Sequence, residues 1–349
     1  MIQLLLILMS IIMIKKVNST CISSITKVNY KGKSLYIKRD DQYHLRCING
    51  IDEIKINGNK IRKFLKLHQQ LSSSSSSSSS SLREIRSYGG IQSNSMVAIA
   101  AITNYHKCKF TYYTKKINDL QRYKDRGNYA VAVNYGMNHI QLSNDEYNNL
   151  NINQNNETID DSIKWIPQGG SYSDAYEGVQ ELVEELVGFI SSQSEERKKW
   201  KIVFSSGTGT TALFAATSLA RYTKQSNLDI EVVAIPCVGT KEYLLEQMIN
   251  LDNSSGSNGI FPTILPTTTL TKRIFGKPMK EHYLIWSELL KETGITFDLI
   301  YAPRAFELLF ESYSIDKDYW NDTITIYYHC GGLEGNDSQL ERYRYSNLI

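Results

Sequence analysis

The chain has 349 residues, of which 41% are hydrophobic and 21% are charged, values typical of a globular protein. This composition excludes a collagen-like chain, a wholly disordered chain and a polytopic membrane protein. The 39 Lys and Arg residues nearly balance the 36 Asp and Glu residues, and no long basic stripe occurs, so we expect no nucleic-acid partner. Small-molecule chemistry is the better expectation.

The N-terminal segment at residues 2–14 is almost entirely apolar and is followed by Lys15 and Lys16. Its length fits the hydrophobic part of a signal peptide and is shorter than the about 20 residues that a transmembrane helix needs. The two lysines, however, lie on the opposite side from the cationic end of a signal peptide. Residues 1–23 are therefore either a targeting or anchoring extension or an extension without that role. The chain is expected to be cytoplasmic, or secretory or membrane-targeted through this segment, with membrane contact only if it is an anchor.

In chain order, short β-branched or aromatic runs alternate with segments of helical periodicity. Strands are predicted at residues 34–39, 109–113, 164–167, 201–205, 231–236, 297–301 and 323–329. Helices are predicted at residues 59–70, 94–104, 175–192, 210–222, 241–250, 280–293 and 304–314. This alternation predicts an α/β fold with parallel strands and helices on both faces, in which ligands bind where strands end and helices begin.

Three polar segments interrupt this alternation. Residues 72–81 are ten consecutive serines, which cannot pack a core and are predicted to form a disordered surface loop. Residues 148–161 are rich in Asn and are predicted to cross between two lobes, and residues 252–259 are predicted to be a third loop. The five cysteines include no CxxC pair, so we expect mostly free thiols and no metal site.

The first glycine-bearing junction is Gly58-Asn59-Lys60-Ile61-Arg62-Lys63, where a turn opens a helix. Lys60 lies in the first helical turn, where the positive end of the helix lowers the pKa of its amine. An amine of lowered pKa is suited to act as a nucleophile. A surface lysine on a basic helix is the alternative interpretation.

Two further junctions could bind anions. Gly89-Gly90-Ile91-Gln92-Ser93-Asn94 precedes a helix whose free N–H groups could hold a carboxylate, although an ordinary turn with an asparagine cap has the same pattern. Ser205-Ser206-Gly207-Thr208-Gly209-Thr210-Thr211 follows a strand and could hold one phosphate through backbone N–H groups and hydroxyls. This loop is neither a Walker A motif nor GxGxxG, so no nucleotide is implied.

Together with Tyr36-Ile37-Lys38-Arg39-Asp40-Asp41, these segments resemble, in this order, the family of 1-aminocyclopropane-1-carboxylate deaminase and D-cysteine desulfhydrase. These are pyridoxal-phosphate enzymes of the tryptophan synthase β-like group, fold type II. The resemblance covers the chain from about residue 24, and it is the ordered set of motifs that makes it specific.

The resemblance implies a role for particular residues. Lys60 would form the Schiff base with pyridoxal 5'-phosphate, Asn94 would contact the phenolic oxygen of the cofactor, and Ser93 would lie by the substrate carboxylate and assist proton transfer. Tyr301 would pack on the ring or donate a proton. The phosphate would be held by the loop, with Lys63 as an addition: Gly207, Thr208, Gly209, Thr210 and Thr211.

The resemblance also implies two lobes of parallel sheet flanked by helices, with the cofactor in the cleft between them. The small lobe would comprise residues 62–160, and the large, cofactor-binding lobe would combine residues 24–61 with residues 161–349. We further expect a homodimer.

Two positions depart from the family pattern. Ala302 stands where the family has a Glu or Thr that faces the pyridine nitrogen, and an alanine cannot hydrogen-bond that nitrogen. Phe275-Gly276-Lys277-Pro278 stands where the family often has a second active-site tyrosine. Both changes argue against opening of a cyclopropane ring, whereas an elimination is helped by its leaving group.

The sequence therefore predicts a pyridoxal-phosphate-dependent lyase or deaminase that acts on a small amino acid. We expect β-elimination from D-cysteine or a similar amino acid, giving a keto acid, ammonia and sulfide. Deamination of 1-aminocyclopropane-1-carboxylate, amino-acid racemisation and a non-catalytic cofactor-binding homologue are the alternatives.

Overall fold

The computed structural model describes residues 22–45, 54–73, 82–118, 125–153, 160–193, 199–223, 228–255, 259–266 and 274–349. The apolar segment at residues 2–14 lies outside these ranges, as do residues 74–81 of the serine run. Within the described ranges, no helix is long and apolar enough to cross a lipid bilayer.

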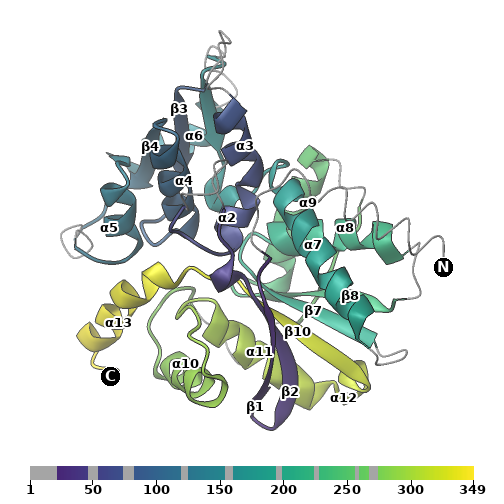
Figure 1. The fold of residues 1–349 in the computed structure, drawn as a ribbon. Helices are drawn as coiled ribbons and strands as arrows, with labels where there is room; N and C mark the ends of the chain where they lie inside the picture. Colours follow the sequence, from purple (N-terminus) through teal and green to yellow (C-terminus); the bar gives the residue numbers. More distant parts are fainter. Residues whose placement is uncertain are drawn as a thin grey trace.

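The larger of two sheets has six strands in the order β1-β2-β10-β7-β8-β9 (Figure 1). β1 pairs with β2 in an antiparallel hairpin, and all other neighbouring strands are parallel. Lys31 and Gly32 at the hairpin tip have φ angles of 47° and 71°, as a type I′ turn requires. The strands are β1 (Ile25–Tyr30), β2 (Lys33–Arg39), β7 (Lys199–Ser206), β8 (Ile230–Pro236), β9 (Thr263–Ile264) and β10 (Thr323–His329).

The smaller sheet has four parallel strands in the order β5-β4-β3-β6. They are β3 (Glu84–Tyr88), β4 (Lys109–Lys115), β5 (Asn138–Leu142) and β6 (Ile163–Ile166). The lobe boundary expected at residue 160 precedes β6, which pairs with β3. We therefore propose that the small lobe continues through residue 166.

Helices cover both faces of the large sheet. α7 and α8 lie on one face and α10 and α11 on the other (Figure 1), which confirms the α/β arrangement expected from the sequence. The helices are α2 (Asn59–Lys63), α3 (Leu65–Ser73), α4 (Asn94–Tyr105), α5 (Gly127–Asn134), α6 (Asn144–Asn153), α7 (Ala175–Ser192), α8 (Thr210–Thr223), α9 (Lys241–Ser255), α10 (Lys280–Thr293), α11 (Ala302–Ile315), α12 (Lys317–Trp320) and α13 (Asn336–Tyr345), with short 3-10 turns η1 (Asp40–Gln42), η3 (Gln168–Gly170) and η5 (Leu333–Gly335).

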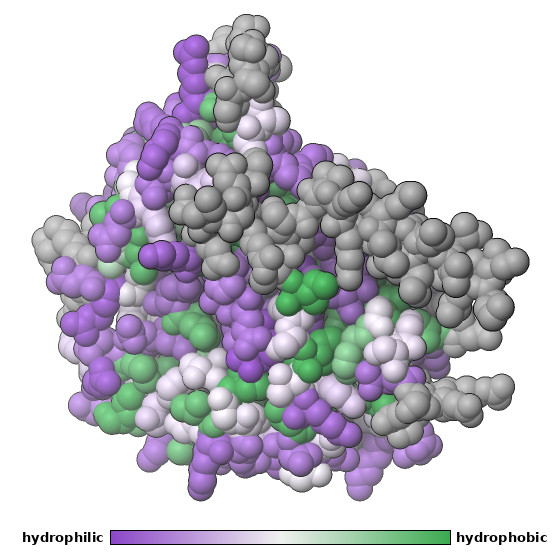
Figure 2. All heavy atoms as spheres, in the orientation of Figure 1, coloured by the Kyte–Doolittle hydropathy of each residue, from purple (hydrophilic) through white to green (hydrophobic). Residues whose placement is uncertain are grey.

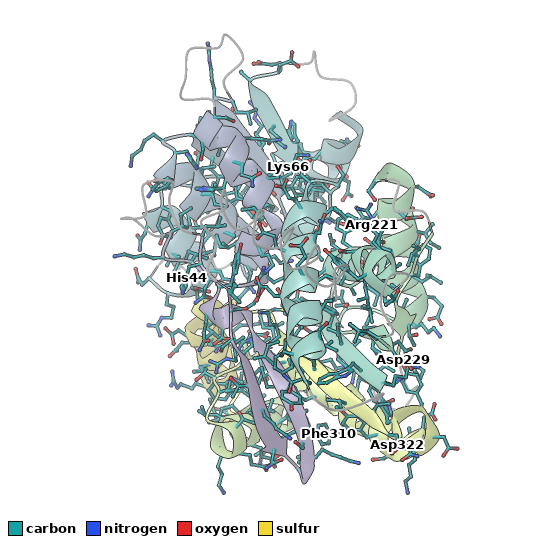
Figure 3. The ribbon with its side chains drawn as sticks, turned by 45° about the vertical axis from the view of Figure 1, so that its right-hand side comes forward. His44, Lys66, Arg221, Asp229, Phe310 and Asp322 are labelled. Carbon is teal, nitrogen blue, oxygen red and sulfur yellow. The ribbon has the colours of Figure 1, made fainter. Side chains whose placement is uncertain are left out.

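The two lobes meet along α3 and α7. Lys66 of α3, labelled in Figure 3, forms an ion pair of 2.8 Å with Asp174, the residue that precedes α7. On the face drawn in Figure 2, hydrophobic residues are scattered among hydrophilic ones. The large apolar side chains are concentrated inside the lobes.

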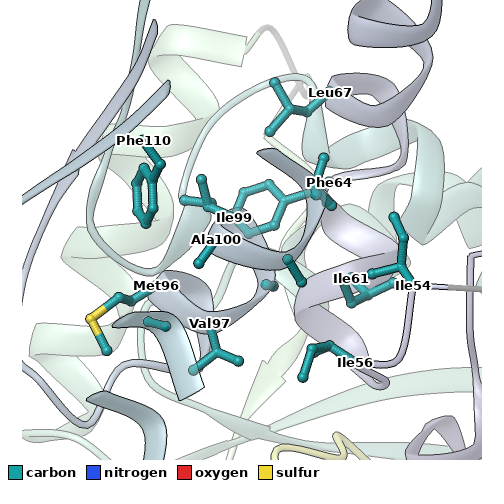
Figure 4. Packing of buried hydrophobic residues seen from close by; sticks show 14 of the residues in the cluster. Ile54, Ile56, Ile61, Phe64, Leu67, Met96, Val97, Ile99, Ala100 and Phe110 are labelled. Carbon is teal, nitrogen blue, oxygen red and sulfur yellow. The ribbon is translucent and has the colours of Figure 1, made fainter. Parts of the chain in front are cut away.

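The core follows the periodicity of the strands. In β7, Ile202 and Phe204 pack with α7 and α8, while Val203 between them faces the layer that contains α11. This alternation arises because successive side chains of a strand point to opposite faces. A separate cluster joins Ile61 and Phe64 to residues of α4 (Figure 4).

Most predicted elements are confirmed, with three corrections. The predicted strand at residues 297–301 is wrong: Phe297 and Leu299 are buried, but the chain turns there because the Asp298 carboxylate accepts the N–H groups of Ile300 and Tyr301. The predicted helix at residues 59–70 is divided at Phe64 into α2 and α3.

The third correction concerns the polar segments. Residues 148–153 belong to α6 and not to a loop, and α9 continues to Ser255. Ser143 and Glu146 form a capping box at the start of α6, in which each side chain bonds to the backbone N–H of the other residue. Ser72 and Ser73 of the serine run belong to α3.

A buried ion-pair network holds α2 against the large lobe. The Arg62 guanidinium is fully buried and donates to both Asp40 oxygens at 2.7 and 2.9 Å and to Glu185 of α7 at 2.9 Å. The Tyr43 ring covers the guanidinium at 3.7 Å, and Lys38 also pairs with Glu185. Paired charges of this kind stabilise a structure only while every partner is present.

Replacing Arg62 with leucine should lower the free energy of unfolding by about 3–5 kcal/mol, because Asp40 and Glu185 would remain as buried carboxylates without this cation. Urea unfolding followed by circular dichroism measures the loss. In the matched control Arg344→Leu, the lost pair is an exposed contact of 2.6 Å with Glu341, and the loss should stay below about 1 kcal/mol. Equal losses in the two variants would contradict the role of the network.

Candidate active site

A cavity of about 700 Å³ lies where the strands of both sheets end and the following helices begin. Ligands bind at this edge in parallel α/β sheets. The structure brings every predicted site residue to the wall of this one cavity: Lys60, Lys63, Ser93, Asn94, Gly207, Thr208, Gly209, Thr210, Thr211 and Tyr301.

The turn that carries Lys60 is held by a close backbone contact. Gly58 has a φ angle of 97°, and a Cβ atom there would lie 2.4 Å from the Cys330 carbonyl oxygen, so no other residue fits without a shift. The Asn59 N–H donates to the same carbonyl at 2.8 Å. The end of β10 therefore fixes the start of α2 and the position of Lys60.

Two lysine amines meet at one carbonyl oxygen. The Lys60 and Lys63 amines donate to the Gly169 carbonyl at 3.0 and 2.9 Å. Gly169 and Gly170 have φ angles of 72° and 65°, the left-handed conformation that glycine adopts readily.

The same geometry lowers the pKa of both amines. Burial lowers the pKa of Lys60, and burial together with the adjacent Lys60 amine lowers the pKa of Lys63 well below its usual value. The sequence argument predicted a lowered pKa for Lys60, and the structure agrees with that direction. The cause is burial, however, and not the positive end of a five-residue helix.

The N-terminus of α4 forms a second wall. Ser93 caps the helix and accepts the Met96 N–H at 3.3 Å. The Asn94 side-chain oxygen accepts a hydrogen bond of 2.7 Å from Asn128, which orients the amide. A Cβ atom on Gly332 would lie 2.3 Å from the Asn94 amide nitrogen, so this glycine gives Asn94 room. The sequence analysis did not identify Asn128 or Gly332.

The loop at residues 207–211 forms an anion cradle at the start of α8. Gly209 has a φ angle of 73°, and the Thr208 and Thr210 hydroxyls are 2.8 Å apart. The Thr211 hydroxyl donates to the Asn59 side-chain oxygen at 3.0 Å, which ties this loop to the lysine turn. Hydroxyls and free N–H groups at a helix N-terminus suit a phosphate.

The remaining wall contains Tyr301, Phe275, Asp298, Ser205 and Cys330. The Phe275 and Tyr301 rings lie 5.1 Å apart, and burial raises the pKa of the Tyr301 hydroxyl, which therefore stays protonated. The sequence analysis named Ser205 only as the start of the loop segment and did not identify Asp298 or Cys330. The position of Cys330 directly after β10 was the available signal for that residue.

Ala302 does not line the cavity. Its side chain is buried in the cluster between α11 and the large sheet. It therefore brings no polar group to the cavity, as expected for an alanine.

Comparisons with known proteins relate the chain to known enzymes and folds. No family model matches the chain. The chain is similar to the mitochondrial bifunctional D-cysteine desulfhydrase/1-aminocyclopropane-1-carboxylate deaminase of Arabidopsis thaliana, with 23% identity over 314 residues that cover 87% of this chain and 73% of the relative.

Among solved structures, the fold is similar to that of a 1-aminocyclopropane-1-carboxylate deaminase homologue, with a TM-score of 0.67, 20% identity, and coverage of 95% of this chain and 98% of the other. A fungal L-serine ammonia-lyase from Rhizomucor miehei has a TM-score of 0.61 at 10% identity, with 93% and 98% covered. The chain is therefore similar to members of the family of 1-aminocyclopropane-1-carboxylate deaminase and D-cysteine desulfhydrase, and it has the fold of the fold type II pyridoxal-phosphate enzymes.

Proposed function

We propose that this pyridoxal-phosphate-dependent enzyme catalyses β-elimination from D-cysteine or a similar small amino acid. The class, a lyase or deaminase, is supported by the similarity to this family. The observation that carries the proposal is that a lysine amine of lowered pKa, an anion cradle and a capped helix N-terminus line the same cavity. A homodimer remains our prediction from the sequence.

The chemistry of the cavity fits the cofactor. The loop at residues 207–211 offers hydroxyls and N–H groups to a phosphate, Lys63 adds an amine, and Lys60 offers an amine to an aldehyde. Asn94 offers an oriented amide to a phenolic oxygen. When bound, pyridoxal phosphate withdraws electrons from the α-carbon of an amino acid.

The residues of the chain divide the remaining work. Lys60 removes the α-proton, and the N-terminus of α4 with Ser93 holds the substrate carboxylate. The protonated Tyr301 hydroxyl donates a proton. The C–S bond breaks with its electron pair on sulfur. One water is consumed in releasing the nitrogen, so that D-cysteine and water give pyruvate, ammonia and hydrogen sulfide.

Two features of the wall favour elimination over ring opening. Phe275 packs against Tyr301 and has no hydroxyl of its own. Ala302 is buried in the cluster between α11 and the large sheet, and an alanine has no carboxylate to offer to a pyridine nitrogen. A thiolate leaving group takes up electrons that the opening of a cyclopropane must pass to the pyridine ring. The elimination therefore depends less on a second tyrosine hydroxyl and on a carboxylate at the pyridine nitrogen.

The test is release of keto acid from a panel of D- and L-amino acids and 1-aminocyclopropane-1-carboxylate by the cofactor-loaded protein. We expect D-cysteine to be turned over with release of sulfide, and the cyclopropane substrate to give at most a trace. Phe275→Tyr should increase ring opening relative to elimination, because it adds a proton donor beside Tyr301. Efficient ring opening by the unmodified protein would refute the substrate assignment, and no turnover at all would favour a non-catalytic homologue.

Lys60 should be the residue that binds the cofactor covalently. Borohydride reduction followed by peptide mass mapping should find the pyridoxyl group on Lys60, because its amine lies at the cavity wall with a lowered pKa. Lys60→Arg should keep phosphate affinity but give no adduct. An adduct on Lys63 would show that the two amines have been assigned the wrong way round.

Phosphate binding to the cofactor-free protein should depend on pH through Lys63. Its pKa is well below the usual value, so the amine loses its charge as the pH rises through that lowered pKa, and a bound phosphate favours the charged form. Once the pH exceeds this lowered pKa, affinity for pyridoxamine 5'-phosphate should therefore fall with rising pH, by up to about tenfold per unit, with proton uptake on binding. Calorimetry in buffers of different ionisation enthalpy measures both quantities.

Lys63→Met should remove the proton uptake and flatten the pH dependence. The matched control is Lys66→Met on the next helix, because that lysine is 43% exposed and pairs with Asp174 outside the cavity wall. Proton uptake that survives in Lys63→Met would show that another group titrates.

A further inference from the structure

The C-terminal helix α13 packs through polar side chains. Asn336, Ser338 and Gln339 are 8%, 4% and 1% exposed. The helix lies between α5 and α10 (Figure 1), and its Tyr343 ring is 5.8 Å from the Tyr283 ring of α10. Buried polar side chains cost free energy unless they are hydrogen-bonded, so the bonds of this face show what the helix holds in place.

The first of these side chains fixes the turn that leads to Tyr301. The Asn336 side chain accepts the Leu299 N–H at 2.8 Å and donates to the Phe297 carbonyl at 2.9 Å. Tyr301, two residues after Leu299, lines the cavity. α13 therefore holds one segment of the cavity wall through its backbone.

The second side chain reaches the segment before α4. The Ser338 hydroxyl lies 3.3 Å from the side-chain oxygen of Gln92, a residue that lines the cavity next to Ser93. A Cβ atom on Gly127 would lie 2.4 Å from the same hydroxyl oxygen, so α5 begins directly against α13. α13 thus also contacts the wall that we assign to the substrate carboxylate.

The third contact is a pair of donors on one carbonyl oxygen. The Gly276 carbonyl accepts the Arg342 guanidinium at 2.7 Å and the Gln339 amide at 3.2 Å. Arg342 also donates to the Gln339 side-chain oxygen at 2.9 Å, which orients that amide. The preceding residue is Phe275, which lines the cavity 5.1 Å from the Tyr301 ring and is 42% exposed. Packing alone holds a ring so exposed only weakly, so its place depends on the backbone beside it.

We propose that Arg342, together with Gln339, is a positioning residue for Phe275. By holding this ring against Tyr301, the pair limits the size of the substrate side chain that the cavity admits. This inference rests on the proposed function, because it takes both rings to face the substrate. Without the guanidinium, the Gly276 carbonyl loses the shorter of its two bonds from α13, and a bond from a charged donor is the stronger kind. The Phe275 ring is then free to turn away from the wall.

The first measurement needs no turnover. In the cofactor-loaded protein with 4-fluorophenylalanine in place of phenylalanine, Phe275→Leu assigns the fluorine-19 signal of this ring. Arg342→Leu should move that signal toward the position of a solvent-exposed ring, and Arg342→Lys should restore it in part, because an ammonium can still donate to the carbonyl. Arg344→Leu is the matched control on the same helix, because its side chain is 59% exposed and pairs with Glu341. The control should leave the signal in place.

The second measurement is selectivity among amino acids. Arg342→Leu should raise the KM for D-cysteine by about tenfold with a smaller change in kcat, the size expected when a bond from a charged group is lost. It should also reduce the preference for D-cysteine over D-amino acids with larger side chains. Affinity for pyridoxamine 5'-phosphate should not change, because the loop at residues 207–211 forms a different wall. Unchanged KM and selectivity would contradict the limit on side-chain size.

An unmoved fluorine signal in Arg342→Leu would overturn the inference, as would an equal shift in Arg344→Leu. If Arg342→Leu does not fold, Arg342→Gln compared with Arg344→Gln decides in the same way, since glutamine is polar but shorter and uncharged. The two proposals fail separately. Turnover of D-cysteine with an unmoved signal refutes the positioning role alone, whereas a moved signal in a protein that turns over no amino acid refutes the proposed function alone.

Discussion

The site depends on the ion pairs that the buried Arg62 guanidinium forms. Its ion pairs join Asp40 of η1, the short helix α2 and the long helix α7, and the Tyr43 ring packs against the guanidinium. α7 packs directly on the backbone of α2 at this point: a Cβ atom on Gly178 would lie 1.8 Å from the Arg62 carbonyl oxygen. Ion pairing and close backbone packing thus act at the same residue.

This constraint explains how a helix of five residues can position a reactive amine. An isolated helix of that length is unstable in water, because forming its first turn costs more than its few hydrogen bonds return. α2 therefore owes its conformation to its surroundings, namely the Arg62 ion pairs on one side and the Cys330 carbonyl on the other. Lys60 and Lys63 flank Arg62 on this helix, so the rigidity of the network reaches both amines.

The sequence predicted those helices and strands in which the spacing of apolar residues matches the side chains that are buried. The apolar stripe of α7 gave its bounds at residues 175–192, because Val179, Leu182 and Leu186 all face the core. The strand predicted at residues 297–301 failed because apolar residues also occur in buried turns, where side-chain capping by Asp298 replaces strand pairing. α6 was missed because its Asn-rich composition outweighed the capping box at Ser143 and Glu146.

The motif residues of the site were likewise predictable, since side-chain chemistry is visible in the sequence. The Gly169 carbonyl that both lysines share was not, because every residue has a carbonyl and only the fold selects one. The same holds for the contact between Cys330 and the lysine turn, which joins residues more than 250 positions apart.

The two edges of the large sheet affect how copies of this chain can associate. One edge ends in β9, a strand of two residues, and the other in the antiparallel strand β1, which ends in a tight hairpin and has Lys27 along it. Short and charged edges are poor templates for addition of another strand, which protects a sheet protein from edge-to-edge aggregation. Joining of two large sheets edge to edge is therefore disfavoured, and each large sheet stays within a single molecule.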